Sequence, residues 1–181
     1  MPGIWRIADY LEGVRWLRHN GFKIYGVVCD GMRGLMQALS PCPVQMCQFH
    51  QMMIVRRYLT QDPDLEAAQT LLELVNGITK MDRESFVGAF ERWAETYKDV
   101  LQERIPDRRY KRPPYRRPLL RSAYLSLKRN MRWLWTFYDN PQLHIPNTNN
   151  GLEGIFSDTK SKLRVHSGLT REHRKKKLIG E

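Results

Sequence analysis

The sequence has few cysteines, no long hydrophobic run and, in its second part, few acidic residues. Its 181 residues include three cysteines, Cys29, Cys42 and Cys47, so a disulfide framework that uses every thiol is excluded. No stretch approaches the roughly 18 consecutive apolar residues of a membrane span. The N-terminus lacks the basic start and apolar stretch of an export signal. We therefore expect a soluble protein of a reducing compartment, located in the cytoplasm, or on the nucleoid in a bacterium.

The shortage of acidic residues is confined to one part of the chain. Residues 1–100 hold 11 basic and 12 acidic residues, whereas residues 101–181 hold 19 basic and 7 acidic residues, so the net charges are −1 and +12. A concentrated basic field attracts polyanions and binds phosphate backbones through the release of counterions. Nucleic acid is therefore the expected partner. The alternative is a basic surface that serves only solubility.

The first part of the chain alternates helix-like and strand-like patterns. Apolar residues at helical spacing predict a helix over residues 7–19, and a segment rich in β-branched residues predicts a buried parallel strand over residues 23–29. After one or two helical turns, a second strand is expected over residues 44–47 and a helix over residues 49–59. This β-α-β-α order predicts strands that lie side by side, joined by crossover helices.

Beyond residue 60 the strand-like patterns give way to helical periodicity. Apolar stripes predict helices over residues 65–78, 86–101 and 120–138, and the aromatic residues of the third stripe are interpreted as core rather than as platforms for stacking bases. Residues 104–118 contain four prolines and seven basic residues, which predicts an irregular basic loop. A last helix is expected over residues 150–163, before a basic tail. The fold class is therefore α/β, mostly α by residue count.

Asp30 lies where the first predicted strand ends, immediately before Gly31. The carboxyl ends of strands in open α/β sheets are where such folds hold their ligands. An Asp-Gly pair also makes a turn, or caps the helix that begins near Arg33, so the local sequence leaves both interpretations open.

Glu153 lies in the first turn of the expected last helix, after the segment Asn147-Thr148-Asn149-Asn150-Gly151. Asn150 and Glu153 have the spacing of a reciprocal helix cap, and a carboxylate in the first turn suits the helix dipole. A capping role and a catalytic role are both open for Glu153 on local sequence alone.

Cys47 and His50 have a Cys-x-x-His spacing at a junction between strand and helix. A structural zinc site needs four ligands, and the remaining histidines show no paired spacing that would complete one: His19, His144, His166 and His173. Nothing marks the base or the oxyanion hole of a thiol protease. We interpret Cys47 and His50 as residues that pack and form hydrogen bonds near the site that Asp30 borders.

Together, these segments resemble the ordered motifs of a known family. The segments are Val27-Val28-Cys29-Asp30-Gly31, then Val44-Gln45-Met46-Cys47-Gln48-Phe49-His50-Gln51, then Asn147-Thr148-Asn149-Asn150-Gly151-Leu152-Glu153-Gly154 with Lys160, Leu163, Arg164, Gly168 and Leu169. In this order they resemble the Mutator-like DDE transposases and the related bacterial insertion-sequence transposases. The resemblance covers roughly residues 5–178.

The resemblance implies an RNase H-like catalytic domain in which three acidic residues bind two Mg²⁺ ions, with Mn²⁺ as a substitute. Asp30 matches the second acid and Glu153 the third, each with a catalytic and metal-binding role, while Cys47 and His50 lie near the site. Two such ions, about 3.5–4 Å apart, activate the attacking water or 3′-hydroxyl and stabilise the leaving oxygen of a phosphodiester.

The same resemblance divides the chain into three parts. Residues 1–60 correspond to a partial RNase H-like core with about two strands, residues 61–146 to a helical insertion that includes the loop 104–118, and residues 147–181 to the return helix of the core with a basic tail.

The first acid of the family has no match in this chain. The family carries it on a strand upstream of the helix that begins here near Ile7, and Asp9 falls inside a helical pattern. We therefore expect a truncated transposase chain, from a family that cuts and joins DNA, that is inactive alone. The alternatives are a non-catalytic DNA-binding remnant or regulator, and a helical structural protein with no role on DNA.

Basic residues of the loop and of the C-terminal region are the candidate DNA contacts. They are Arg108, Arg109, Lys111, Arg112, Arg116, Arg117, Lys160, Lys162, Arg164, Lys175, Lys176 and Lys177. Besides DNA, other transposase chains in a homo-oligomer are expected partners. No membrane and no small-molecule substrate is expected.

Overall fold

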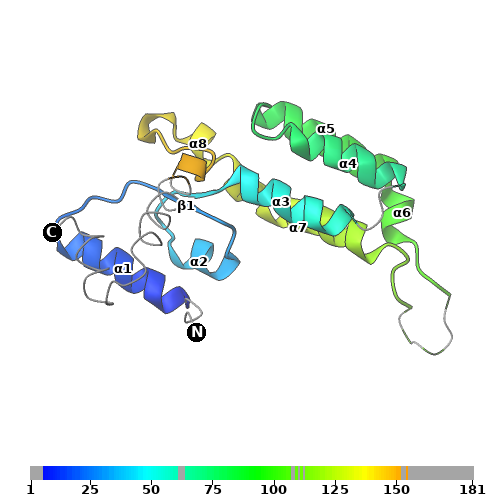
Figure 1. The fold of residues 1–181 in the computed structure, drawn as a ribbon, viewed down its shortest axis with the longest axis horizontal. Coiled ribbons are helices and arrows are strands. Elements are labelled where there is room, and N and C mark those ends of the chain that lie inside the picture. The colour runs from blue at the N-terminus through cyan, green and yellow to red at the C-terminus, as the bar shows by residue number, and fades with distance from the viewer. Residues whose placement is uncertain are drawn as a thin grey trace, which may run out of the picture. The chain divides into compact units, whose positions relative to one another are not determined.

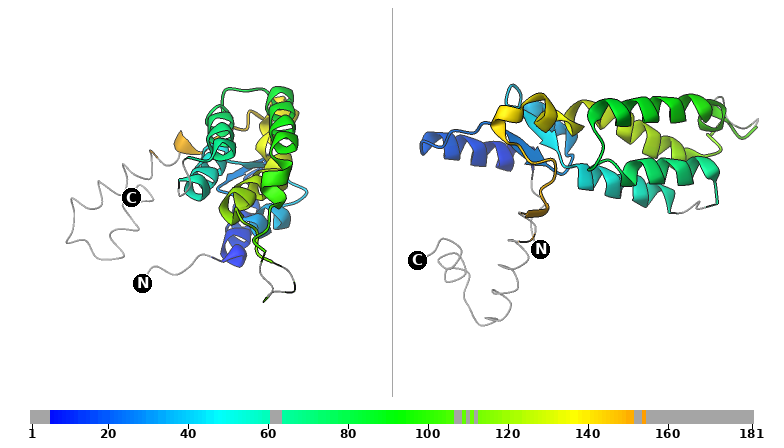
Figure 2. Two further views of the ribbon diagram at one scale, coloured as in Figure 1. Left: turned by 90° about the vertical axis from the view of Figure 1, so that its right-hand side faces the viewer. Right: turned by 90° about the horizontal axis from the view of Figure 1, so that it is seen from above.

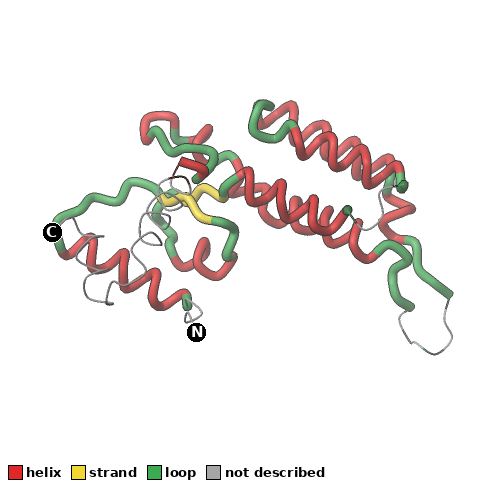
Figure 3. Tube along the Cα trace, viewed as in Figure 1, coloured by secondary structure: helices red, strands yellow, loops and turns green. Residues whose placement is uncertain are grey.

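The structure, a computed structural model, describes residues 6–60, 64–106, 109, 111, 113–151 and 154. These residues are mostly helical and include one small parallel sheet of two strands (Figure 3). The expected α/β class with a helical majority is therefore confirmed. Residues Met1–Thr148 form one compact unit and Asn149–Glu181 a second.

The β-α-β-α order predicted for the first part of the chain is present. α1 (Ile7–His19) is followed by β1 (Val27–Cys29), α2 (Arg33–Ala38), β2 (Val44–Met46) and α3 (Gln48–Leu59). The two strands are parallel, with Val27 opposite Val44 and Cys29 opposite Met46. β1 is shorter than the predicted strand over residues 23–29. Its pairing extends only along β2, and β2 begins just after Pro43, which has no N–H to donate to a ladder.

α1 lies at the outside of its unit and buries none of its residues completely. Ile7, Leu11 and Val14 pack against the core from one side of the helix, which contacts α2. The other side exposes Trp16, which is 61% exposed. In the segment between α1 and β1, Phe22 is 58% exposed and Tyr25 is 62% exposed. A large aromatic surface is therefore left in contact with solvent.

The helical part contains α4 (Glu66–Asn76), α5 (Arg83–Thr96), α6 (Lys98–Gln102), α7 (Pro118–Leu134), α8 (Thr136–Asp139) and the 3-10 helix η1 (Pro141–Leu143). α3 packs against α7 and α4, and α4 packs against α5 (Figure 1). Stacking of Phe90 on Tyr124, with ring centroids 5.6 Å apart, joins α5 to α7. These four helices run alongside one another (Figure 2).

Two of the predicted helices are interrupted in the structure. The stripe over residues 86–101 is divided at Tyr97 into α5 and α6, and the stripe over residues 120–138 is divided at Trp135 into α7 and α8. Trp135 leaves the helical conformation and is buried against Phe86, with ring centroids 5.0 Å apart. The burial of this large ring is the physical reason for the second break.

The residues of the predicted basic loop that the structure describes are mostly irregular. Within it, Arg104 and Tyr115 form an isolated antiparallel bridge, and the loop ends earlier than expected because Pro118 opens α7. Proline suits the first turn of a helix, where its missing N–H would have no partner.

One apolar core connects the sheet to the long helices. Met46 of β2, Val55 of α3, Leu71 of α4, Phe86 of α5 and Leu127 of α7 belong to the same buried cluster. α3 therefore packs with both the sheet and the helices beyond residue 60. The division into a core of residues 1–60 and an insertion of residues 61–146 stays a prediction about ancestry. Among the helices in the described ranges, none combines the length and the apolar character needed to cross a membrane.

Candidate active site at the carboxyl ends of the strands

The carboxyl ends of β1 and β2 meet at one edge of the sheet. Because the strands are parallel, Asp30 follows β1 at the edge where Cys47 follows β2. The backbone N–H of Cys47 donates a hydrogen bond of 2.8 Å to the carbonyl oxygen of Cys29. The Asp-Gly and Cys-x-x-His motifs, separated along the sequence, are thereby neighbours in space.

Asp30 is exposed, and its side chain has no hydrogen bond or ion pair with any residue that the structure describes. It does not cap α2, whose N-cap is Met32 without a side-chain hydrogen bond. The capping interpretation is therefore wrong, because the chain turns for two residues before the helix begins. The carboxylate is left available to a ligand.

Gly31 fixes the turn that carries Asp30. Its φ of +102° is in the range that favours glycine, and a Cβ at this position would clash with the side chain of Met46. The turn therefore packs closely against the carboxyl end of β2. This close approach holds the Asp30 backbone at the sheet edge.

Asn147 is tied to the same edge through Gln48, the first residue of α3. The backbone N–H of Gln48 donates to the carbonyl oxygen of Asn147 at 3.0 Å, and the Asn147 Nδ2 donates to Gln48 Oε1 at 3.1 Å. Gln48 is fully buried, and its Nε2 donates to the carbonyl oxygen of Leu134 at 2.9 Å. The start of the third motif is thus placed beside the second.

Glu153 follows Asn147 by six positions and lies outside the described residues. Of the predicted last helix, Asn150, Gly151 and Gly154 are described, and all three are helical. The assignment of Glu153 as the third acid therefore stays a prediction.

Three buried glutamines are the part of this region that the sequence analysis missed. Besides Gln48, the side chain of Gln45 accepts from the backbone N–H of Phe137 at 3.1 Å, and Gln51 Nε2 donates to Ser126 Oγ at 3.1 Å. They connect the sheet edge and α3 to α7 and α8. Their regular spacing of three residues could have predicted this role, because Gln48 and Gln51 lie on the same face of a helix.

Cys47 lies at the edge that Asp30 borders and His50 lies in the first turn of α3, and their role near a functional site stays a prediction. Cys47 is fully buried as the N-cap of α3, and His50 is half-buried in the first turn, edge-on to Phe49 with ring centroids 6.2 Å apart. These positions suit packing at the strand-to-helix junction.

Burial raises the pKa of the Cys29 thiol above its ordinary value, and the nearby negative charge of Asp30 and the Cys47 thiol raise it further. A hydrogen bond from the Gly31 backbone acts in the opposite direction but does not outweigh burial. Cys29 therefore stays a protonated, weakly nucleophilic thiol at neutral pH.

The described residues by themselves do not supply a ligand set for a metal ion. No group of three His, Cys, Asp or Glu side chains within the described ranges is placed to hold one. At the sheet edge, Asp30 is the hard oxygen donor, and its neighbours Cys29 and Cys47 are soft, buried thiols. The expectation of Mg²⁺ or Mn²⁺ at this edge therefore stays a prediction from the family resemblance.

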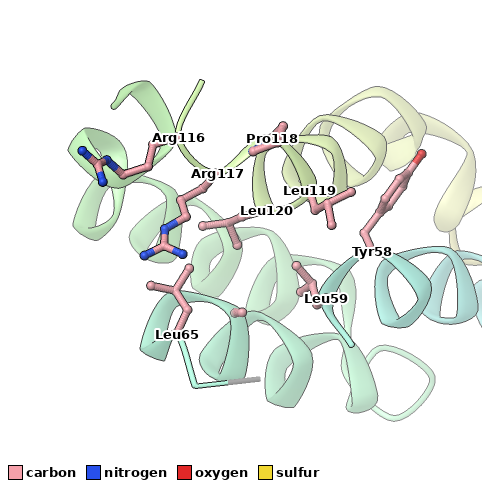
Figure 4. A pocket seen from close by; sticks show the side chains of 9 residues that line it. Tyr58, Leu59, Leu65, Arg116, Arg117, Pro118, Leu119 and Leu120 are labelled. Atoms are coloured by element: carbon pink, nitrogen blue, oxygen red, sulfur yellow. The ribbon is translucent and has the colours of Figure 1, made fainter. Parts of the chain in front are cut away.

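The candidate DNA contacts of the loop differ in their surroundings. Arg116 Nε lies 2.6 Å from Glu103 Oε1 in an exposed ion pair. Arg109 and Lys111 are also exposed to solvent. Arg117 points into a cavity of about 360 Å³ toward Leu65, and Arg116 points away from it (Figure 4). The other candidates lie outside the described residues: Arg108, Arg112, Lys160, Lys162, Arg164, Lys175, Lys176 and Lys177.

Comparison with known proteins found no match to this chain among protein-family models, curated proteins or solved structures.

Proposed function

We propose that the chain is part of the catalytic domain of a DDE-type DNA transposase, with an RNase H-like core, in which Asp30 and Glu153 are two of the three catalytic acids. One observation carries the proposal. The exposed carboxylate of Asp30, the Cys47 segment and Asn147 are brought to the same edge of a parallel sheet. Residues from all three motifs that resemble the family in sequence therefore lie at the same end of the sheet.

The chemistry of such a site concerns the phosphodiester backbone of DNA. The strongly basic second part of the chain, at +12, supports a polyanionic substrate. Mg²⁺, or Mn²⁺ in its place, enters the proposal through the family resemblance alone and would supply charge stabilisation and activation of the attacking hydroxyl. The contribution of this chain is to fix Asp30 on a tight turn and Asn147 on the buried Gln48.

Two of the three acids are assigned within the 181 residues, so the chain alone is proposed to be inactive. A site of this class that lacks one acid loses both charge and geometry for at least one ion. Other transposase chains, in a homo-oligomer on DNA, are the proposed partners.

The test uses the purified 181-residue chain with supercoiled plasmid and with a labelled duplex. We expect salt-dependent binding of DNA and no nicking in Mg²⁺ or Mn²⁺. If the wild type nicks DNA and both Asp30→Ala and Glu153→Ala abolish the nicking, the proposed site is supported and the proposal that the chain is inactive alone is wrong. Nicking that survives in Asp30→Ala would overturn the site, and failure to bind DNA even at low salt would overturn the function on DNA.

A second candidate is a DNA-binding chain without catalysis, either a remnant or a regulator that competes with an intact enzyme. It is favoured by the lack, among the described residues, of any group of three His, Cys, Asp or Glu side chains placed to hold a metal ion. DNA binding that is unchanged in Asp30→Ala and Glu153→Ala, together with the absence of Mn²⁺ binding by the chain, would favour this candidate over the first.

A further inference from the structure

α7 carries basic residues on its exposed face and no acidic residue anywhere in its 17 positions. Its buried side, which includes Leu120, Ala123 and Leu127, faces the other long helices. The basic residues, spaced so that they share the opposite side, are Arg121, Lys128, Arg129 and Arg132. None of these four is among the candidate DNA contacts identified from the sequence.

Three cations of this face form no ion pair within the described part of the protein. Other cations form ion pairs, such as Arg83 with Asp139 at 2.6 Å and Lys98 with Glu95 at 3.1 Å. Lys128, Arg129 and Arg132 have no carboxylate within ion-pair distance among the described residues. An external anion is the remaining partner for them.

Contacts on the helix itself restrict these side chains without removing their charge. The Arg132 guanidinium lies 3.9 Å from the centroid of the Trp133 ring, and the Lys128 ammonium lies 5.7 Å from that of Tyr124. Arg129 Nε donates to the carbonyl oxygen of Leu125 at 3.0 Å. Restricting the side chains in advance lowers the entropy that is lost when they bind a ligand.

α7 is also held firmly in its unit, so the face is presented by a fixed element. Asn130 Nδ2 donates to Gln51 Oε1 at 2.8 Å, and Gln51 Nε2 donates to Ser126 Oγ at 3.1 Å, both across to α3. The carbonyl oxygen of Leu134 at the end of the helix accepts from Gln48. A rigid helix keeps the spacing of its cations constant.

The dimensions fit a nucleic-acid backbone. From Lys128 to Arg132 the helix rises about 6 Å, a length over which duplex DNA presents about three to four backbone charges. The acidic residues Glu84 and Glu91 of α5 line a cleft of about 590 Å³ together with Lys128 and its basic neighbours.

We propose that the outer face of α7, through Lys128, Arg129 and Arg132, binds the phosphate backbone of duplex DNA. The inference rests on the proposed function, since it takes DNA as the partner. It adds a surface outside the sheet edge and outside the proline-rich loop. Contacts of this kind position a protein on the duplex and carry no base sequence.

The experiment measures binding of the full chain to a fluorescent duplex of about 20 bp, between about 50 and about 200 mM salt. The test variant combines Lys128→Gln, Arg129→Gln and Arg132→Gln. The matched control combines Arg15→Gln, Arg18→Gln and Lys23→Gln, which removes the same charge from exposed positions around α1. Arg15 even has the same local hydrogen bond as Arg129, from Nε to the carbonyl oxygen four residues earlier. Circular dichroism and a thermal melt of each variant check that the fold is kept.

We expect the test variant to bind at least ~10-fold more weakly than the wild type and to lose about two to three units from the slope of log affinity against log salt. The control is expected to change affinity by less than ~3-fold. Equal losses in both variants, or an unchanged slope in the test variant, would overturn the α7 surface while leaving DNA as the partner. A wild type that binds no DNA would overturn both proposals.

Discussion

Gln48 and Asn147, which lie 99 positions apart in the sequence, are joined by two hydrogen bonds, one donated by each residue. The backbone N–H of Gln48 donates to the Asn147 carbonyl, and the Asn147 amide returns a hydrogen bond to the Gln48 side chain. This pair brings the third sequence motif to the sheet edge that Asp30 borders. The first prediction concerns it directly.

Gln48→Leu is expected to lower the free energy of unfolding by about 1–3 kcal/mol, because the half-buried Asn147 amide loses its acceptor and the Leu134 carbonyl loses one of its two donors. Urea denaturation measures the change. Gln37→Leu, at an exposed position of α2, serves as the control and is expected to change stability by less than ~0.5 kcal/mol. Equal effects of the two substitutions would mean that the hydrogen bonds of Gln48 add nothing.

Gly31→Ala is expected to destabilise the protein more than Gly21→Ala. Both glycines have a positive φ, of +102° and +82°, so both substitutions strain the backbone. A Cβ at Gly31 would in addition clash with Met46, whereas at Gly21 it would meet nothing within 4 Å. Urea denaturation of the two variants separates the clash from the strain, and a Gly31→Ala variant no less stable than Gly21→Ala would argue against the close-packed turn.

Asp82 caps α5 by accepting hydrogen bonds from the backbone N–H of Ser85 at 2.8 Å and from its hydroxyl at 2.7 Å. These bonds hold the pKa of Asp82 below its ordinary value of 3.8. A lowered folded-state pKa contributes stability above the unfolded-state pKa, and this stability is lost as the pH falls through the folded-state pKa.

The corresponding variant is Asp82→Asn, which can still cap but cannot ionise. The wild type is expected to exceed it in melting temperature above about pH 4, and the difference is expected to shrink steadily as the pH falls further. Thermal melts of both proteins across this range give the result. A difference that stays constant with pH would show that ionisation of Asp82 has no part in the cap.

The exposed aromatic surface of Trp16, Phe22 and Tyr25 is expected to promote self-association. Light scattering of the wild type is expected to rise with concentration and to fall in a variant that carries Trp16→Glu, Phe22→Ser and Tyr25→Ser. Tyr138→Ser on α8, another exposed aromatic position, is the control and is expected to scatter like the wild type. A wild type that stays monomeric at high concentration would contradict the prediction.

Local patterns were sufficient for the order of the elements in the first part of the chain. Helical spacing placed α1 at Ile7–His19, and the β-branched segment before Asp30 placed β1. The length of β1 could not be predicted, because it depends on where Pro43 ends the pairing on the other strand. The break at Trp135 likewise depends on Phe86, which lies about fifty positions away in the sequence.

The candidate site was predictable only in part, for a similar reason. Asp30 was found because the end of a parallel strand has a local signature, whereas Asn147 entered only as part of the ordered set of motifs that resembles the family. The contact of Asn147 with Gln48 was not found, since a buried glutamine looks like any polar residue until its partners are known. The sequence analysis assigned no role to the basic residues of α7, and their lack of ion pairs among the described residues became visible only in three dimensions.

We propose that Asp30 and Glu153 belong to one metal-binding site at the sheet edge. It is tested most directly by adding substoichiometric Mn²⁺ to the ¹⁵N-labelled chain and recording which backbone amide signals broaden. We expect the amide signals around Asp30, Cys47 and Glu153 to broaden together in the wild type and to stay sharp in Asp30→Asn. Broadening confined to one of these segments, or broadening that persists in Asp30→Asn, would contradict it.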